Sequence, residues 1–231
     1  MYKVAYFRFK EKNDADEIKL LRRIVRPGMV VYDIGANIGF YAEILSGLVQ
    51  KQGQVICFEP DGENFAHLER TTRYLRNVRI LRNAVSDADG KISIYRSKLL
   101  NVDHRTYPVK DYESVDEIGA VNIDNLIDDK QVPRPDVIKI DIQGYELAAF
   151  RGMQKLLTEA RDLNIIAEYW PHGFKRAGTS ALEFYDFFDA KGYRFQVIGE
   201  DGLKPLKRGY VADNNDQVFE FSFNVLISKK P

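Results

Sequence analysis

The spacing of apolar residues along the chain switches repeatedly between a helical and an extended pattern. Helical spacing predicts a helix over 14–26 within a helical lead-in (1–26), and further helices over 38–49, 61–75, 147–157 and 181–190. Apolar or alternating runs predict strands over 30–33, 54–60, 78–81 with 84–85, 91–95, 136–142, 163–169, 193–198 and 219–227, and a short strand into a helical turn over 121–127. This alternation predicts a doubly wound, mostly parallel α/β sheet with one antiparallel strand near the C-terminus.

Two stretches between these elements have no regular period. Residues 86–90 are rich in turn formers and lead into the alternating run 91–95, which predicts a hairpin there. Residues 97–114 are polar and aromatic. A stretch of this length inside a compact domain is usually functional, so we expect it to be an active-site loop.

Composition narrows the class of protein and partner. At 231 residues the chain is long enough for a single domain, 1–231, with a full core, although it would also fit as one domain of a longer protein. Lys+Arg and Asp+Glu each total 34, so no net field attracts nucleic acid. No stretch approaches the roughly 18 apolar residues of a membrane span, and residues 1–12 lack the apolar centre of a leader peptide, which predicts a cytoplasmic protein. The single cysteine, Cys57, lies in an apolar strand and is expected to be buried and inert.

The turn after the first strand indicates a nucleoside cofactor. It carries Asp33 where a dinucleotide-binding turn has its first glycine, and Gly35 and Gly39 follow. A carboxylate there repels a pyrophosphate but suits a ligand with a cationic end, such as S-adenosyl-L-methionine. Glu59, about twenty residues further along, matches the acid that accepts ribose hydroxyls in nucleotide folds. The alternative is that Asp33 caps the next helix and Glu59 is a solvated strand end.

Acidic residues also mark the ends of two later strands. Asp141 lies at the end of the strand predicted over 136–142 and Glu168 at the end of that over 163–169, and ligands of such sheets bind at the carboxyl ends of strands. We therefore expect one acidic rim, although Asp141 could instead cap a helix. Lys139 in the same apolar run would be costly to bury alone, so it either pairs with one of these acids or reaches solvent at the strand edge.

The predicted active-site loop supplies a candidate base. His104, between Asp103 and Arg105, titrates near neutrality and could accept the proton of a hydroxyl during methyl transfer. Alternatively, Asp103, Asp141 and Glu168 could hold a hard cation such as Mg²⁺ that acidifies the hydroxyl. A lone histidine in a polar loop is also compatible with a solvated surface residue.

Aromatic residues follow the fifth predicted strand. Tyr169, Trp170 and His172 combine ring faces with polar donors, which suits a sugar ring, and equally suits a cover over the end of the sheet.

Taken together, these segments resemble the FkbM-type family of S-adenosylmethionine-dependent methyltransferases. The resemblance extends from Pro27 to about Tyr193 and rests on the motifs VVYDIGANIGFY (30–41), CFEPDGENF (57–65), NAVSD (83–87), DHR (103–105), IKIDIQGYE (138–146) and EYWPHG (168–173). It implies a Rossmann-like sheet of seven strands, the class I methyltransferase type. It implies that the cofactor, which becomes S-adenosyl-L-homocysteine, is held by Asp33, Gly35, Ala36, Asn37, Gly39, Glu59, Pro60, Ala84 and Asp141.

The resemblance also implies a reaction. Members of the family methylate hydroxyl oxygens, and His104, Asp141 and Glu168 are expected to face the reacting centre, with Asp103, Arg105, Tyr169, Trp170 and His172 toward the acceptor. The leading hypothesis is O-methylation of a carbohydrate hydroxyl of a glycan or glycolipid. The alternatives are O-methylation of a macrolide-type natural product, N- or C-methylation, and a non-catalytic cofactor- or glycan-binding module of a glycan-building protein. The short N-terminal region departs from the family pattern and leaves the substrate-side lid and the oligomeric state open.

Overall fold

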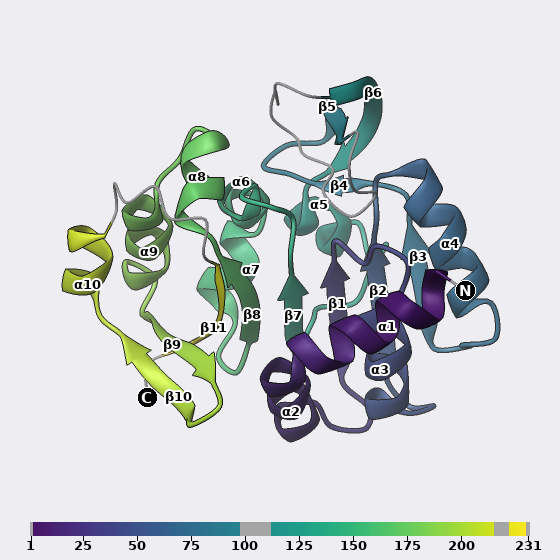
Figure 1. The fold of residues 1–231 in the computed structure, drawn as a ribbon, viewed down its shortest axis with the longest axis horizontal. Helices are drawn as coiled ribbons and strands as arrows, with labels where there is room; N and C mark the ends of the chain where they lie inside the picture. Colours follow the sequence, from purple (N-terminus) through teal and green to yellow (C-terminus); the bar gives the residue numbers. More distant parts are fainter. Residues whose placement is uncertain (1, 98–111, 215–221, 230–231) are drawn as a thin grey trace.

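The computed structural model describes residues 2–97, 112–214 and 222–229. Within them an eight-stranded sheet runs through the centre of the molecule, and a three-stranded sheet stands beyond the carboxyl ends of its middle strands (Figure 1). The order in the large sheet is β10 (Gly202–Leu206), β9 (Tyr193–Gly199), β11 (Phe223–Lys229), β8 (Asn164–Tyr169), β7 (Val137–Ile140), β1 (Val30–Ile34), β2 (Gln54–Phe58) and β3 (Val78–Leu81). The small sheet contains β4 (Ala84–Val85), β6 (Tyr112–Val121) and β5 (Gly90–Ser97), in that order.

The large sheet is mostly parallel, as its apolar strands predict. The neighbouring strands β3, β2, β1, β7 and β8 pair in parallel. Strand β11 runs antiparallel to both β8 and β9, and β10 is antiparallel to β9. The predicted fold class is therefore confirmed, with one difference in number: the seven expected strands are present, and β10 adds an eighth at the edge.

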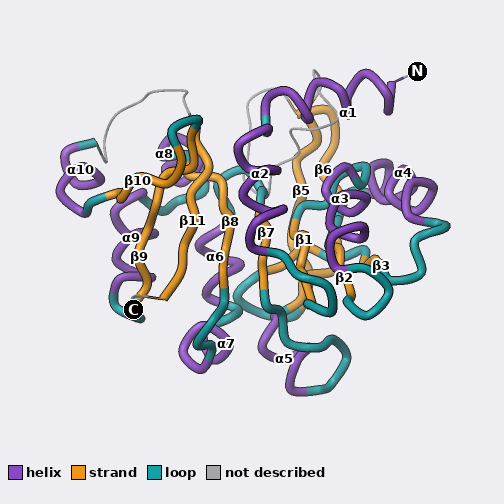
Figure 2. The backbone as a smooth tube through the Cα atoms, turned by 90° about the horizontal axis from the view of Figure 1, so that it is seen from below, coloured by secondary structure: helices purple, strands orange, loops and turns teal. Residues whose placement is uncertain are grey.

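Helices cover both faces of the large sheet (Figure 2). One face carries α1 (Tyr2–Asn13), α2 (Ala15–Ile24), α3 (Phe40–Val49) and α4 (Gly62–Thr72). The other carries α5 (Ile123–Asp128), α6 (Glu146–Arg151), α7 (Gln154–Glu159), α8 (Pro171–Arg176), α9 (Ala181–Asp189) and α10 (Arg208–Asp213). Since side chains alternate along a strand, each middle strand supplies both apolar layers: Tyr32 and Ile34 pack on the second face, Val31 on the first. No helix in the described ranges is long and apolar enough to cross a membrane.

Several local predictions are confirmed. Asp61 caps α4, accepting hydrogen bonds from the backbone N–H groups of Glu63 and Asn64 at 2.9 Å each. Cys57 is fully buried, and burial raises the pKa of its thiol well above the usual value, as expected of an inert thiol.

Other local predictions are wrong. The runs 78–81 and 84–85 belong to different sheets, since β3 pairs with β2 and β4 pairs with β6. The hairpin predicted at 86–90 does not form between β4 and β5, because β6 lies between them and pairs with both. Residues 112–114 belong to β6 rather than to a loop. The helix predicted over 147–157 is divided at Gly152 into α6 and α7, and α8, β10 and α10 were not expected.

Candidate active site

The glycine turn after β1 packs tightly against the chain that follows β7. Gly35 has φ +81°, and a Cβ on it would lie 2.1 Å from the backbone oxygen of Asp141. The N–H groups of Gly35 and Ala36 both donate to the carbonyl of Phe58, at 2.9 and 3.1 Å. Glycine is required here, because a side chain would meet backbone and because L-residues disfavour this φ.

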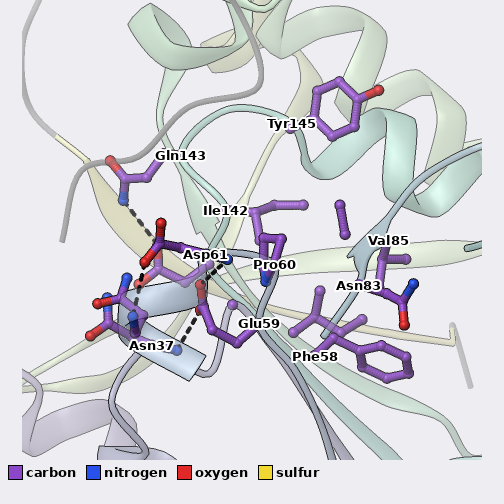
Figure 3. Close-up of a pocket in the computed structure, with 15 residues that line it drawn as sticks. Asn37, Phe58, Glu59, Pro60, Asp61, Asn83, Val85, Ile142, Gln143 and Tyr145 are labelled. Carbon is purple, nitrogen blue, oxygen red and sulfur yellow. Dashed lines mark hydrogen bonds between the residues drawn. The ribbon is translucent and has the colours of Figure 1, made fainter. Parts of the chain in front are cut away.

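Glu59 holds the same turn from the end of β2. Its Oε2 accepts the N–H of Asn37 at 2.8 Å and its Oε1 accepts the N–H of Asp61 at 3.0 Å (Figure 3). The residue is 5% exposed, so it is not a solvated strand end. Burial raises the pKa of its carboxyl group to about 7, against which the two backbone hydrogen bonds act. Each carboxylate oxygen retains a lone pair for a further donor.

These residues line a pocket of about 630 Å³, part of it open to solvent. Of the residues predicted to hold a cofactor, it brings together Gly35, Asn37, Glu59, Pro60, Ala84 and Asp141, and leaves out Asp33, Ala36 and Gly39. Sequence reasoning missed the lining residues Asp61, Asn64, Asn83, Gln143 and Tyr145. Asp61 and Asn83 each follow a parallel strand by a few residues, a position that could have identified them.

Asp33 occupies a different place from the one expected. It is fully buried on the opposite face of β1 from Tyr32 and Ile34, and neither carboxylate oxygen has a hydrogen-bond partner in the described part of the chain. Burial raises its pKa to about 6, and the nearby Lys139 ammonium opposes that rise. It does not cap α3, whose first turn follows Gly39 and has no side-chain cap.

Lys139 pairs with an acid, as one of its two readings predicted. It is 3% exposed, so it does not reach solvent, and its Nζ lies 3.6 Å from Oδ2 of Asp141 and 4.5 Å from the centre of the Tyr41 ring. Burial works to raise the pKa of Asp141, but the Lys139 ammonium outweighs it and holds that pKa below its usual value. Asp141 is therefore ionised near neutral pH.

A second cavity of about 890 Å³, also partly open, lies on the other side of Asp141. Asp141 and Glu168 line it together with residues of α1 and α2 and of the segment leading into β11. Gln143 connects the two acids, since its Nε2 donates to Oδ1 of Asp141 at 3.0 Å and to Oε2 of Glu168 at 3.2 Å. Burial, followed by the charges of Asp141 and Glu146, raises the pKa of Glu168 to about 8. Of the strand-end acids, Asp141 and Glu168 thus share one site.

The aromatic residues after β8 divide into two groups. Tyr169 is 3% exposed and stacks on Phe223 at a centroid distance of 4.9 Å, so it belongs to the core rather than to a sugar-binding surface. Trp170 and His172 are partly exposed, with ring centroids 5.8 Å apart. They retain the exposure that an acceptor contact requires.

The predicted base His104 and its neighbours Asp103 and Arg105 lie outside the described residues. Among residues 2–97, 112–214 and 222–229, no three His, Cys, Asp or Glu side chains form a group that could hold a metal ion. The hypothesis of a cation on Asp103, Asp141 and Glu168 therefore depends on a residue outside these ranges.

Known proteins match this chain in sequence and in fold. The methyltransferase FkbM domain matches residues 33–195. Hexuronic acid methyltransferase AglP of Haloferax volcanii is 32% identical over 147 residues, which cover 63% of this chain and 59% of the relative. The 2-O-methyltransferase NoeI of Sinorhizobium fredii is 25% identical over 169 residues, covering 65% of this chain and 69% of the relative.

The fold is similar to that of solved methyltransferase structures. Precorrin-6y C5,15-methyltransferase of Geobacter metallireducens superimposes with a TM-score of 0.53 at 12% identity, covering 94% of this chain and 88% of its own. The fold is that of class I S-adenosylmethionine-dependent methyltransferases, and the chain belongs to the FkbM methyltransferase domain family.

Proposed function

We propose that the protein transfers the methyl group of S-adenosyl-L-methionine to a hydroxyl oxygen of a carbohydrate. The observation that carries this proposal is the position of Asp141, which lines both cavities. Methyl transfer needs donor and acceptor in line at one point, and a carboxylate common to two adjoining cavities marks such a point. The name of the Haloferax relative supports a sugar acceptor and that of the Sinorhizobium relative supports transfer to oxygen, although this chain spans only 59% of the Haloferax protein.

The residues of the first cavity fit the cofactor. The free lone pairs of Glu59 suit the two ribose hydroxyls, and Gly35 lets the turn pack directly against the Asp141 backbone on the wall of the same cavity. Phe58, Pro60 and Val85 offer apolar surface for a purine base. When bound, the cofactor supplies an electrophilic methyl group on a sulfonium cation, which the ionised Asp141 favours by its charge.

The residues of the second cavity would then bind the acceptor and orient its hydroxyl. As the new oxygen–carbon bond forms and the carbon–sulfur bond breaks, the hydroxyl proton must pass to a base. We assign Asp141 to orient that hydroxyl by accepting its hydrogen bond, with Gln143 fixing the carboxylate. Glu168 retains its proton near neutral pH because its pKa is about 8, and His104 is the proposed proton acceptor.

The test combines cofactor binding with product analysis. We expect S-adenosylhomocysteine to bind in calorimetry, Glu59→Ala to abolish that binding, and labelled S-adenosylmethionine to yield a methyl ether on an oligosaccharide panel. His104→Ala and Asp141→Asn should lower turnover about 100-fold or more. A product methylated on nitrogen, or full turnover in both variants, would contradict O-methylation. Cofactor binding without any product would favour a binding module. Loss of turnover in EDTA, restored by Mg²⁺, would support the cation on Asp103, Asp141 and Glu168.

A further inference from the structure

The charge of the chain is not spread evenly along it. Residues 2–26, which contain α1 and α2, hold eight Lys and Arg but only four Asp and Glu, although the whole chain is balanced. Two of the four acids add little negative charge to the surface, because Asp14 pairs with Lys10 and Glu17 is 4% exposed. These two helices are therefore a basic part of a protein whose net charge is zero.

The cations of these helices share one surface. Both helices pack on the same face of the large sheet, and α2 follows α1 after Asp14 (Figure 1). Six cationic side chains on or next to them are exposed, and none forms an ion pair with a carboxylate of the described residues: Arg8, Lys12, Lys19, Arg22, Arg23 and Arg26. Because exposed side chains of a helix packed on a sheet point away from the sheet, we call these six the basic face.

Apolar side chains are exposed among these cations. Val4 is 58% exposed and Phe9 is 63% exposed. They lie on the same side of α1 as Arg8 and Lys12, since Val4 precedes Arg8 by four residues and Phe9 precedes Lys12 by three. The inner side of α1 has an aromatic residue of its own for packing, because the ring of Phe7 lies 5.1 Å from an aromatic ring of α3. The packing of α1 on α3 therefore does not account for Val4 and Phe9.

We propose that the basic face docks on an anionic lipid bilayer, with Val4 and Phe9 entering the boundary between the headgroups and the acyl chains. Clusters of about four to eight Lys and Arg are attracted to the negative potential of such a surface. Apolar side chains beside the cations add burial in the bilayer, as in other interfacial helices. A nucleic acid would also attract the cations through its phosphates, but it would offer no apolar layer to an aliphatic side chain such as Val4.

The basic face adjoins the second cavity. Lys10 and Asn13, at the end of α1, and Asp16, on α2, line that cavity. A bilayer docked on these helices would therefore lie beside the wall of the cavity that we assign to the acceptor. The docking goes beyond the proposed function, and its test needs no methyl transfer.

Vesicle cosedimentation of the full chain tests the proposal. Vesicles of phosphatidylcholine alone are compared with vesicles of equal parts phosphatidylcholine and phosphatidylserine. At about 0.1 M salt we expect binding to the phosphatidylserine vesicles to be at least about tenfold tighter. At about 1 M salt, where the charges are screened within a few ångströms, this difference should disappear.

Three variants attribute the binding to the basic face. Arg22→Gln combined with Arg23→Gln removes two cations and should weaken binding to the phosphatidylserine vesicles about tenfold or more. Phe9→Ser keeps the charge and should weaken binding about fivefold or more, because an apolar side chain no longer enters the bilayer. Arg161→Gln combined with Lys207→Gln is the matched control and should bind like the wild type. These two exposed cations lie next to α7 and α10, which cover the other face of the sheet.

All of the substituted side chains are exposed, so the circular dichroism spectra and melting temperatures should match those of the wild type. Equal binding to the two kinds of vesicle, unchanged binding in the Arg22 and Arg23 variant or in Phe9→Ser, or an equal loss in the control would overturn the inference. Tighter binding of an RNA or DNA oligonucleotide than of the vesicles, measured by fluorescence anisotropy, would also overturn it. Failure of the proposed methyl transfer is seen separately, as absence of S-adenosylhomocysteine binding or of any methylated sugar.

Discussion

Replacing Gly35 by alanine tests whether the contact between the β1 turn and the chain after β7 builds the cofactor site. The added Cβ would lie 2.1 Å from the backbone oxygen of Asp141 and 3.0 Å from Cγ2 of Ile142. Neither can move without shifting Asp141, because the N–H of Asp141 donates to the carbonyl of Ile34 at 3.0 Å. The turn and the Asp141 segment must therefore separate.

The magnitude follows from two contributions. The positive φ of +81° costs an alanine about 1–2 kcal/mol, and the forced contact adds about 1–3 kcal/mol, the range seen for overpacked interiors. Gly28→Ala isolates the first contribution, since Gly28 has φ +90° and its Cβ would meet nothing within 4 Å. We expect Gly35→Ala to lower the free energy of unfolding by roughly 3 kcal/mol and Gly28→Ala by roughly 1 kcal/mol.

Urea denaturation measures the stability of both variants, and calorimetry with S-adenosylhomocysteine measures their cofactor affinity. Gly35→Ala should bind at least about tenfold more weakly than the wild type, while Gly28→Ala should bind equally well. Equal destabilisation by the two substitutions, or unchanged affinity in Gly35→Ala, would refute the reasoning.

Three further predictions follow from the buried charges. Glu59→Gln should weaken S-adenosylhomocysteine binding about tenfold or more with little change in the melting temperature. The affinity of the wild type should fall as the pH drops below about 7, where Glu59 becomes protonated. Equal affinity at pH 6 and pH 8 would argue against a role of the Glu59 carboxylate in binding. Lys139→Met should lower the free energy of unfolding by about 3–5 kcal/mol, because it leaves the fully buried Asp33 and the half-buried Asp141 without the ammonium that faces them. Lys155→Met, which breaks an exposed pair with Asp128, should leave the urea midpoint almost unchanged, and similar midpoints for the two variants would contradict this. Burial raises the pKa values of Glu17 and Glu59 to about 7, so the folded state binds more protons than the unfolded state between about pH 4.5 and 7. The free energy of unfolding should therefore fall by roughly 1–3 kcal/mol per group as the pH rises through that interval. Urea titrations should show a smaller fall in Glu17→Gln, and a rise in the wild type would reject the assignment.

The middle of the sheet could be predicted from sequence because its strands are buried on both faces. β1, β2, β7 and β8 appear in the sequence as continuous apolar runs, and the turns after them carry the acids and glycines that define the site. These signals are local, so no partner strand had to be known.

The remainder depends on long-range pairing that local patterns do not record. The two residues of β4 continue the β3 run in sequence, yet their partner is β6, more than 30 residues further along. The helical pattern over 147–157 is divided at Gly152, where a long-range contact requires glycine because a Cβ would lie 2.0 Å from the backbone oxygen of Ser86.

Asp33 lies near the end of β1 but does not line the first cavity, so its predicted contact with the cofactor stays a prediction. Its position at the strand end suggested a ligand contact, but alternation along β1 puts it on the α2 and α3 side, opposite Tyr32 and Ile34.

Transfer of an isotope-labelled methyl group from S-adenosylmethionine to a panel of oligosaccharides tests the central claim most directly, with the product located by mass spectrometry and NMR. The account predicts a labelled methyl ether on a sugar oxygen, formed together with S-adenosylhomocysteine and reduced about 100-fold or more by Asp141→Asn. A labelled methyl group on nitrogen or carbon, or turnover that does not depend on Asp141, would contradict it.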